Sequence, residues 1–334
     1  MKLATPQWWY ERKPTAPRTR ALMTPLSLIW AAATARRIAR AHPLDPGVPV
    51  ICVGNLTLGG AGKTPVAREI AHRLAARGRV AYLVSRGYGG RLKGPVRVDP
   101  QRHTSDEVGD EPLMLAEDLP VWVSRDRAAG ARAAAAGGAE VVVLDDGHQN
   151  PSVAKTLSLV VVDGETRGGE WPFGDGRVFP AGPMREPLAA GLARAQAVIV
   201  LLPADLPAPD PELIAQLGDK PVIIAHLEAA AAPPRGPQLG FAGVGKPWKV
   251  ERALRTAGCD LVDFAPLPDH FAYGEAALQR LAERAAQFGA GLITTEKDWV
   301  RLPKSWRTRI AAWPVRARFD DPAGLDALLS RAGL

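Results

Sequence analysis

Short apolar runs recur along the middle of the chain, and they restrict its fold more than any other feature. They are Val48–Val53, Val80–Val84, Val121–Val123, Val141–Leu144, Leu159–Val162, Val198–Leu202 and Val222–Ala225. Their apolar residues are continuous rather than alternating, which predicts strands that are covered on both faces. Stretches such as Val66–Arg77, with Val66, Ile70 and Leu74 on one helical face, separate the runs. The pattern predicts an α/β fold with a mainly parallel sheet and helices on both faces.

A proline-rich stretch divides the chain. Residues 229–237 read AAAAPPRGP, which is typical of a linker. After it we expect further strands and helices at Leu239–Ala242, Trp248–Thr256, Leu261–Phe264, Glu275–Phe288, Leu292–Thr294 and Gly324–Arg331. We therefore expect three parts: a basic N-terminal segment (residues 1–42), a first α/β domain (43–232) and a smaller C-terminal α/β domain (233–334).

The positive charge of the chain is concentrated at its N-terminus. The net charge is +7, and residues 1–42 hold eight of the 42 Lys and Arg but one of the 35 Asp and Glu. The rest of the chain is therefore neutral overall. A nucleic-acid-binding protein needs its positive charge spread over a folded face, so we expect no nucleic-acid partner. The two cysteines, Cys52 and Cys259, lie far apart in apolar runs, which suggests neither a disulfide nor a zinc site and fits a reducing compartment.

The same N-terminal segment is rich in tryptophan and apolar residues. Trp8, Trp9 and Trp30 lie in it, and residues 22–33 form an apolar run that is followed by arginines. The run is too short to span a membrane, which takes about 20 residues. Aromatic residues, a short amphipathic helix and flanking cations fit a segment that lies in the interface of an anionic membrane. The alternative is a helix that packs on the domain and leaves its arginines solvated.

A phosphate-binding loop follows the first strand. Residues 53–64 read VGNLTLGGAGKT and open the helix at Val66–Arg77, which is the strand–loop–helix context of the P-loop motif. Glycines let backbone amides surround a phosphate, and the helix N-terminus adds partial positive charge. Thr57 stands where the motif has glycine, so we interpret the loop as a variant. The residues expected to bind the nucleotide are Thr57, Leu58, Gly59, Gly60, Ala61, Gly62, Lys63 and Thr64.

A second strand ends in the acids that such a site needs. The run Val141–Leu144 leads into Asp145 and Asp146, as expected for carboxylates that hold Mg²⁺ together with the Thr64 hydroxyl. We expect one of the two acids to face the metal. The alternative is an acidic turn at the end of a strand.

Several motifs together resemble one family. They are TLGGAGKTP (57–65), SRGYGG (85–90), VGDEP (108–112), LDDGHQ (144–149), PAGPMREP (180–187), FAGVGKP (241–247), PDH (268–270) and TEKD (295–298). Their order and content are similar to those of the tetraacyldisaccharide 4′-kinase family of Gram-negative bacteria, and the resemblance spans nearly the whole chain. It implies transfer of the γ-phosphate of ATP, with Mg²⁺, to the 4′-hydroxyl of a tetraacylated glucosamine disaccharide 1-phosphate. The product would be lipid IVA in lipid A biosynthesis.

The resemblance also implies roles for individual residues. Asp110 corresponds to the family's catalytic aspartate, and His270, from the smaller domain, pairs with it; Lys63 completes the catalytic set. Taken alone, Asp110 could cap a helix and His270 could be a structural histidine. The loops that would line the acceptor site contribute Arg86, Tyr88, Arg185 and Glu186, although loop arginines also form surface ion pairs.

The sequence departs from the family pattern after Asp146 and after His270. It has His148 and Asn150 where the family usually has Phe and His, and Phe271 where the family often has a second His.

We expect an enzyme on the cytoplasmic face of the inner membrane that is peripheral or shallowly anchored by its N-terminal segment, and we expect no protein partner. The main alternative function is a membrane-associated P-loop switch or positioning ATPase. Such proteins carry a signature lysine at the position of Leu58, which argues against it.

Overall fold

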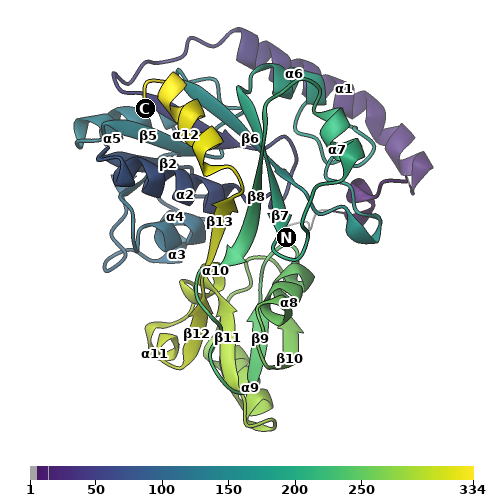
Figure 1. Cartoon of the computed structure of the whole chain (residues 1–334), viewed down its shortest axis with the longest axis vertical. Coiled ribbons are helices and arrows are strands. Elements are labelled where there is room, and N and C mark those ends of the chain that lie inside the picture. Colours follow the sequence, from purple (N-terminus) through teal and green to yellow (C-terminus); the bar gives the residue numbers. More distant parts are fainter. Residues whose placement is uncertain (1–5, 14) are drawn as a thin grey trace.

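The strands form two separate sheets in the computed structural model, which describes residues 6–13 and 15–334 (Figure 1). Neighbouring strands in the larger, nine-stranded sheet are parallel, except at its two edges. There β13 pairs antiparallel with β8, and β3 pairs antiparallel with β4. The spatial order of its strands is β13 (Val315–Phe319), β8 (Val222–Ala229), β7 (Ala197–Pro203), β6 (Leu157–Asp163), β1 (Val50–Gly54), β5 (Val141–Asp145), β2 (Ala81–Ser85), β4 (Val121–Val123) and β3 (Val96–Arg97).

Helices cover both faces of this sheet, which is why its inner strands are apolar throughout. One face packs against α2 (Lys63–Ala76), α4 (Asp110–Leu115) and α12 (Pro322–Arg331). The other face packs against α5 (Arg127–Ala136), α6 (Leu188–Ala193) and α7 (Pro211–Gln216). The short helix α3 (Ser105–Val108) precedes α4, and a 3₁₀ turn, η2 (Arg167–Gly169), follows β6. The predicted α/β fold with a mainly parallel sheet is confirmed.

The smaller sheet has four parallel strands in the order β10 (Leu261–Pro266), β9 (Gln238–Ala242), β11 (Gly291–Thr295) and β12 (Ile310–Trp313). Helices α9 (Glu275–Ala286) and α11 (Lys304–Arg307) contribute to one of its hydrophobic clusters and α8 (Pro247–Thr256) to the other. Helix α10 (Glu296–Trp299) follows β11 directly. We call residues 238–313 the small unit and the nine-stranded sheet with its helices the large unit.

The end of the chain returns to the large unit. The sequence-based division assigned residues 233–334 to one smaller domain, whereas β13 pairs with β8 and the Leu325 and Leu329 side chains of α12 lie in the main core. Strand β13 reads VRARF, alternating apolar and charged residues, because Ala317 and Phe319 face the main core while Arg316 and Arg318 face solvent. A search for continuous apolar runs passes over such a strand.

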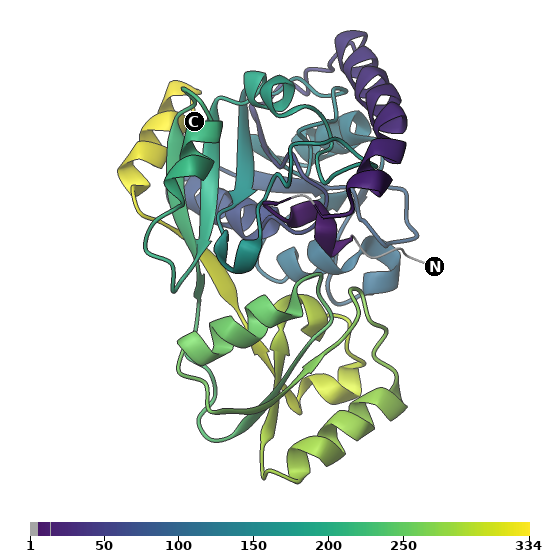
Figure 2. The ribbon, with the colours of Figure 1, turned by 90° about the vertical axis from the view of Figure 1, so that its right-hand side faces the viewer.

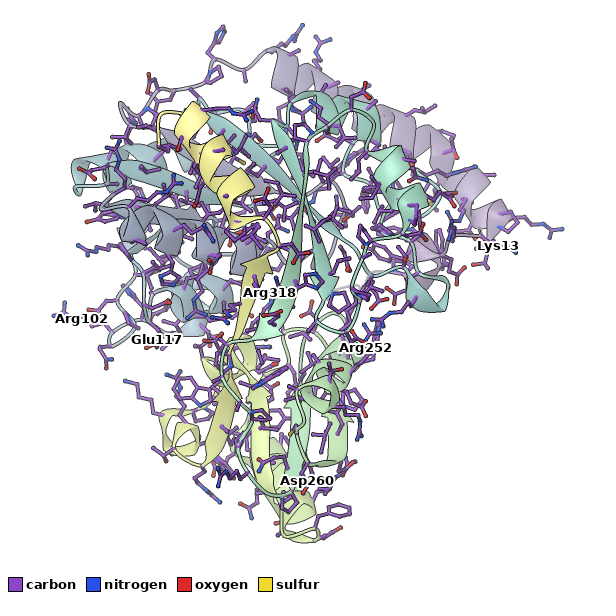
Figure 3. All side chains as sticks on the ribbon, viewed as in Figure 1. Lys13, Arg102, Glu117, Arg252, Asp260 and Arg318 are labelled. Carbon is purple, nitrogen blue, oxygen red and sulfur yellow. The ribbon has the colours of Figure 1, made fainter. Side chains whose placement is uncertain are left out.

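Ion pairs join the two units on both sides of their contact. On one side, the Lys249 ammonium lies 2.7 Å from the Asp163 carboxylate at the end of β6, and Arg252 pairs with Glu165. Figure 3 shows Arg252 at the level where the units meet, and Asp260 toward the far end of the small unit. On the other side, Arg68 of α2 lies 3.0 Å from Glu296 of α10. The small unit is thus tied to the carboxyl end of the large sheet.

The N-terminal helix α1 (Pro17–Ala39) has an unusual distribution of side chains. Its buried residues are Arg20, Ser27 and Thr34, whereas large apolar residues face outward. The exposed fractions are 74% for Leu22, 53% for Leu26, 67% for Leu28, 65% for Ile29 and 46% for Trp30. Figure 2 shows α1 running along the outside of the large unit. Within the described residues, no helix combines the length and apolar character that a membrane crossing requires.

Candidate active site

The predicted phosphate loop connects the end of β1 to the start of α2. The amides of residues 59–62 donate no hydrogen bond to any part of the chain that the structure describes, so they are available to a phosphate. Gly59 and Gly62 have φ values of +92° and +77°, which favour glycine. A Cβ on Gly62 would also lie 2.2 Å from the Leu201 side chain. The glycines therefore shape an open row of donors at the N-terminus of α2.

Thr57 fits this loop although the motif has glycine there. Its φ is not positive, and its backbone forms an isolated antiparallel bridge with Met184. The Thr57 carbonyl accepts hydrogen bonds from the Asn55 amide at 2.8 Å and from the Arg185 Nε at 2.9 Å. The backbone at this position is extended and held from outside the loop, so a side chain is tolerated.

One carboxylate at the end of β5 fits a magnesium site. The Thr64 hydroxyl donates to Asp145 Oδ2 at 3.1 Å, while Asp145 Oδ1 is buried and has no hydrogen-bond partner among the described residues. Burial, together with the charge of Glu111, raises the pKa of Asp145 to about 7, although Lys63 lowers it. A buried acceptor without a partner, next to a hydroxyl and opposite open phosphate donors, fits a cation that also binds phosphate oxygens. No cluster of three or more His, Cys, Asp or Glu that could hold a metal alone occurs in the described part of the chain.

The neighbouring Asp146 is engaged differently. It has a φ of +58°, and its carboxylate accepts hydrogen bonds from both terminal nitrogens of Arg185, at 2.9 and 3.2 Å. Lys63 Nζ lies 3.7 Å from the same carboxylate. Burial opposes ionisation of Asp146, but Lys63 and Arg185 outweigh it and hold its pKa below the usual value. Asp146 therefore anchors Lys63 and Arg185, whereas Asp145 keeps a free oxygen.

Asp110 and His270 come from the two units and meet. Asp110 is the first residue of α4 and is 5% exposed; its Oδ2 lies 2.9 Å from His270 Nδ1. Its Oδ1 accepts the Glu111 amide at 2.9 Å, so it also contributes at the helix N-terminus. Burial would raise the pKa of Asp110, but the hydrogen bond with His270 and the charges of Lys297 and Arg301 lower it to about 2. The carboxylate is ionised at neutral pH.

The backbone holds His270 in position. Its φ of +57° is uncommon for a non-glycine residue, and its amide donates to the Gly243 carbonyl at 3.1 Å. The His270 ring lies 5.6 Å from the Tyr88 ring, centroid to centroid. Tyr88 is on the loop after β2, so this loop and the small unit meet beside Asp110. Asp110, Tyr88 and His270 therefore gather at one place.

Two cations beside Asp110 were missed from the sequence. Lys297 Nζ lies 4.0 Å from the Asp110 carboxylate and 3.1 Å from that of Glu111, and Arg301 Nε lies 3.7 Å from Asp110. Burial lowers the pKa of Lys297, but Glu111 and Asp110 outweigh it and raise that pKa above the ordinary value. The buried Asp298 binds the Tyr273 hydroxyl at 2.6 Å and also pairs with Arg301. The TEKD motif at 295–298 was the available signal, but a motif does not reveal which acid its lysine faces.

The four residues predicted to bind the acceptor have different surroundings. Arg86 and Tyr88 are exposed, and Arg86 makes no hydrogen bond or ion pair with the described residues. Arg185 holds Thr57 and Asp146, as described above. Glu186 is 2% exposed and binds Arg194 at 2.6 Å and Gln149 at 3.0 Å. Arg86 and Tyr88 thus lie at the surface, with the Tyr88 ring beside His270, whereas Arg185 and Glu186 support the phosphate loop and its surroundings.

The departure from the family pattern at residue 148 lies in the core. His148 is buried, with Nδ1 3.0 Å from the Ser158 hydroxyl and Nε2 2.9 Å from the Gly191 carbonyl. Burial and the Arg194 charge lower its pKa to about 4. His148 is therefore a neutral, hydrogen-bonded residue that packs between β6 and α6.

Comparisons with known proteins identify the family of this chain. A family model described as tetraacyldisaccharide-1-P 4′-kinase matches residues 19–333. A tetraacyldisaccharide 4′-kinase of Phenylobacterium zucineum (strain HLK1) is 73% identical over 98% of this chain and 99% of its own length. One from Caulobacter vibrioides (strain NA1000 / CB15N) is 67% identical over the full length of both. A crystal structure of LpxK from Aquifex aeolicus in complex with ATP has the same fold, with a TM-score of 0.75 and 24% identity over 94% of this chain and 99% of that one. The chain belongs to the tetraacyldisaccharide-1-P 4′-kinase family.

Proposed function

We propose that the protein transfers the γ-phosphate of ATP to the 4′-hydroxyl of a tetraacylated glucosamine disaccharide 1-phosphate, which yields lipid IVA. The observation that carries this proposal is the Asp110–His270 pair, which lies beside the loop after β2 in a chain that also has an open phosphate loop. A phosphate loop alone does not specify an acceptor. A buried, ionised carboxylate aligned by a histidine gives the hydroxyl group a place to bind.

The proposed mechanism begins with the phosphate loop. The free amides of residues 59–62 and the Lys63 ammonium hold the phosphates of ATP and stabilise the charge that develops during transfer. Thr64 and Asp145 would hold Mg²⁺. When bound, Mg²⁺ neutralises charge on the phosphate oxygens.

Asp110 then acts on the acceptor hydroxyl. The 4′-oxygen forms its bond to the γ-phosphorus, the bond from that phosphorus to the leaving ADP oxygen breaks, and the hydroxyl proton passes to Asp110. A carboxylate with a pKa of about 2 is a weak base, but it orients the hydroxyl, and a largely dissociative transfer needs little proton removal before the transition state. His270 fixes the direction of the carboxylate. Arg86 and Tyr88 bind oxygens of the sugar or of its 1-phosphate.

We further propose that the three parts of the chain, residues 1–42, 43–232 and 233–334, have different functions. The second part carries the nucleotide, and the third supplies His270. Contact between the two, as in the Asp110–His270 pair, completes the site. The β13 and α12 segments at the end of the third part serve the nucleotide-binding part, because they pack in its core.

The outer face of α1 supports a location on the cytoplasmic face of the inner membrane. A helix in water exposes polar residues and buries apolar ones, whereas α1 exposes Leu22, Leu28 and Ile29 and buries Arg20 and Ser27. Exposed cations at Arg36, Arg37 and Arg40 follow this face. An apolar face with flanking cations binds the interface of an anionic membrane.

Transfer can be tested directly. The protein is incubated with γ-labelled ATP, Mg²⁺ and the tetraacyldisaccharide 1-phosphate in detergent, and labelled lipid is the expected product. Labelled inorganic phosphate without labelled lipid would instead indicate a switch ATPase.

Membrane binding needs a separate test. Sedimentation with anionic vesicles should fall in Leu22→Glu/Ile29→Glu and stay unchanged in Val80→Glu/Val262→Glu, which alters exposed apolar residues elsewhere. Equal sedimentation of all three proteins would contradict the proposed location.

A further inference from the structure

The N-terminal segment contacts the phosphate loop before it reaches α1. In the 3₁₀ helix η1 (Gln7–Tyr10), the Tyr10 hydroxyl donates a hydrogen bond to the Leu58 carbonyl inside the loop. A Cβ on Gly59 would lie 3.0 Å from the same hydroxyl oxygen. The contact joins residues 48 positions apart in the sequence and is partly buried.

This contact fixes one peptide group of the loop. The Leu58 carbonyl and the Gly59 amide belong to the same planar trans peptide, so they point in opposite directions. Holding the carbonyl toward Tyr10 therefore directs the Gly59 amide away from Tyr10, and this amide has no partner within the described chain. On the other side, the Leu58 amide donates to the Pro183 carbonyl at 2.8 Å. Glycine-rich backbone has many alternative conformations, so an external hydrogen bond at this point selects one of them.

Tyr10 is itself held from several directions. Its carbonyl accepts the Trp171 amide at 2.5 Å, and Lys246 of the small unit lies over its ring, with Nζ 5.3 Å from the ring centroid. Burial, with the charges of Asp163 and Glu170, raises the pKa of Tyr10 above its ordinary value despite the opposing charge of Arg185. The hydroxyl therefore stays protonated and remains a donor.

A second contact connects α1 to the same region. The Trp30 indole nitrogen donates to the Arg185 carbonyl at 3.1 Å, and the Arg185 side chain holds Thr57 and Asp146. Trp30 is partly exposed and belongs to the apolar outer surface of α1, so the same residue joins that surface to a support of the nucleotide site.

We propose that Tyr10 is a positioning residue for ATP binding: its hydroxyl orients the Leu58–Gly59 peptide so that the Gly59 amide can bind a phosphate oxygen. The inference rests on the proposed function, because it assigns the loop to ATP. It gives the N-terminal segment a task in nucleotide binding that is separate from membrane attachment.

The test uses the full-length protein and a fluorescent ATP analogue with Mg²⁺, without lipid. Tyr10→Phe removes the hydroxyl alone, and we expect the Kd of the analogue and the KM for ATP to rise about three- to tenfold, the effect of one lost hydrogen bond. The KM for the lipid acceptor and the kcat at saturating ATP should stay within about twofold of wild type. The matched control is Tyr82→Phe. It also removes one hydroxyl, which donates to the Gly137 carbonyl at the end of α5 at 3.1 Å and, among the described residues, makes no contact with the phosphate loop.

The outcomes separate this inference from the proposed function. A Kd for the analogue in Tyr10→Phe within twofold of wild type, in a protein that still phosphorylates the lipid, overturns the role of Tyr10 and leaves the kinase assignment intact. Failure of the wild type to bind the analogue overturns the assignment of the loop itself. A lower kcat and a higher KM for the lipid, together with weaker ATP binding, would mean that Tyr10 supports the fold in general. This result would also overturn the inference.

Discussion

The two halves of the candidate site are built in different ways. The phosphate-loop half consists of a contiguous segment, residues 57–64, and the acids at the end of an adjacent strand of the same sheet. The half around Asp110 depends on His270, Lys297 and Arg301, which the small unit supplies from up to 191 residues away along the chain. The loop and the acids of the first half all belong to the large unit. The second exists only while the two units are in contact, so the two halves should respond to mutation in different kinetic parameters.

The largest effect is expected at Asp110. Asp110→Asn keeps the size of the side chain and removes its charge, so kcat should fall about 10²- to 10⁴-fold. The Kd for ATP should stay within about twofold of wild type, because the phosphate contacts lie in the other half. Rapid-quench measurement of labelled lipid gives kcat, and equilibrium binding gives Kd. A parallel loss of ATP affinity would show that the two halves are not separable.

A loss of about 10²- to 10³-fold in kcat/KM is expected for Lys63→Met, since it removes a positive charge from the transferring phosphate. Unlike Asp110→Asn, this variant should also raise the Kd for ATP. Lys220→Met is the control, because Lys220 donates to the Ala195 carbonyl and takes no part in either half. Unchanged turnover in Lys63→Met would refute the assignment of the loop.

His270→Asn tests the contact between the units with a milder change. Asparagine accepts the left-handed backbone conformation of residue 270, so the turn should be kept while the hydrogen bond to Asp110 is lost. We expect kcat to fall roughly 10- to 100-fold, as for a misaligned reacting group. Loss of this hydrogen bond should also move the pKa of Asp110 upward from about 2. A kcat equal to that of wild type would leave His270 with a structural role.

The smallest expected effect is a pH dependence of the Mg²⁺ requirement, which arises in the phosphate-loop half. The pKa of Asp145 is raised to about 7, and Mg²⁺ binds the ionised carboxylate. Below pH 7 the metal must displace a proton, so the Mg²⁺ concentration for half-maximal activity should rise about tenfold per pH unit, and it should be constant well above pH 7. The stability of the metal-free protein should depend on pH in the opposite direction. The folded state favours the protonated form of Asp145, so the free energy of unfolding should fall as pH rises from about 4 to 7. An Mg²⁺ requirement that does not change between pH 6 and pH 8 would contradict a metal role for Asp145.

The difference between the halves also explains what the sequence could predict. The loop was predicted residue by residue because its geometry follows from a contiguous glycine pattern between a strand and a helix. Asp145 and Asp146 were found as a pair, but not told apart, since their roles depend on Arg185, which arrives from a separate loop. Lys297 and Arg301 were missed for the same reason: the sequence of α10 and of the residues after it does not reveal that Asp110 lies opposite. The edge strand β13 was missed because it alternates, and the small N-terminal turn at Tyr10 carries no pattern that would place it on the loop.

The chain leaves the large sheet and re-enters it at neighbouring points. Strand β8 ends at Ala229, strand β13 begins at Val315, and these two residues are paired directly across the antiparallel ribbon. The small unit is therefore an insertion tethered by two chain crossings at one edge, instead of a domain that trails from a single linker. Two adjacent crossings restrict the placement of the small unit more than a single linker would. The distance between His270 and Asp110 therefore depends on a connection to β8 and β13 that contains none of the site's residues.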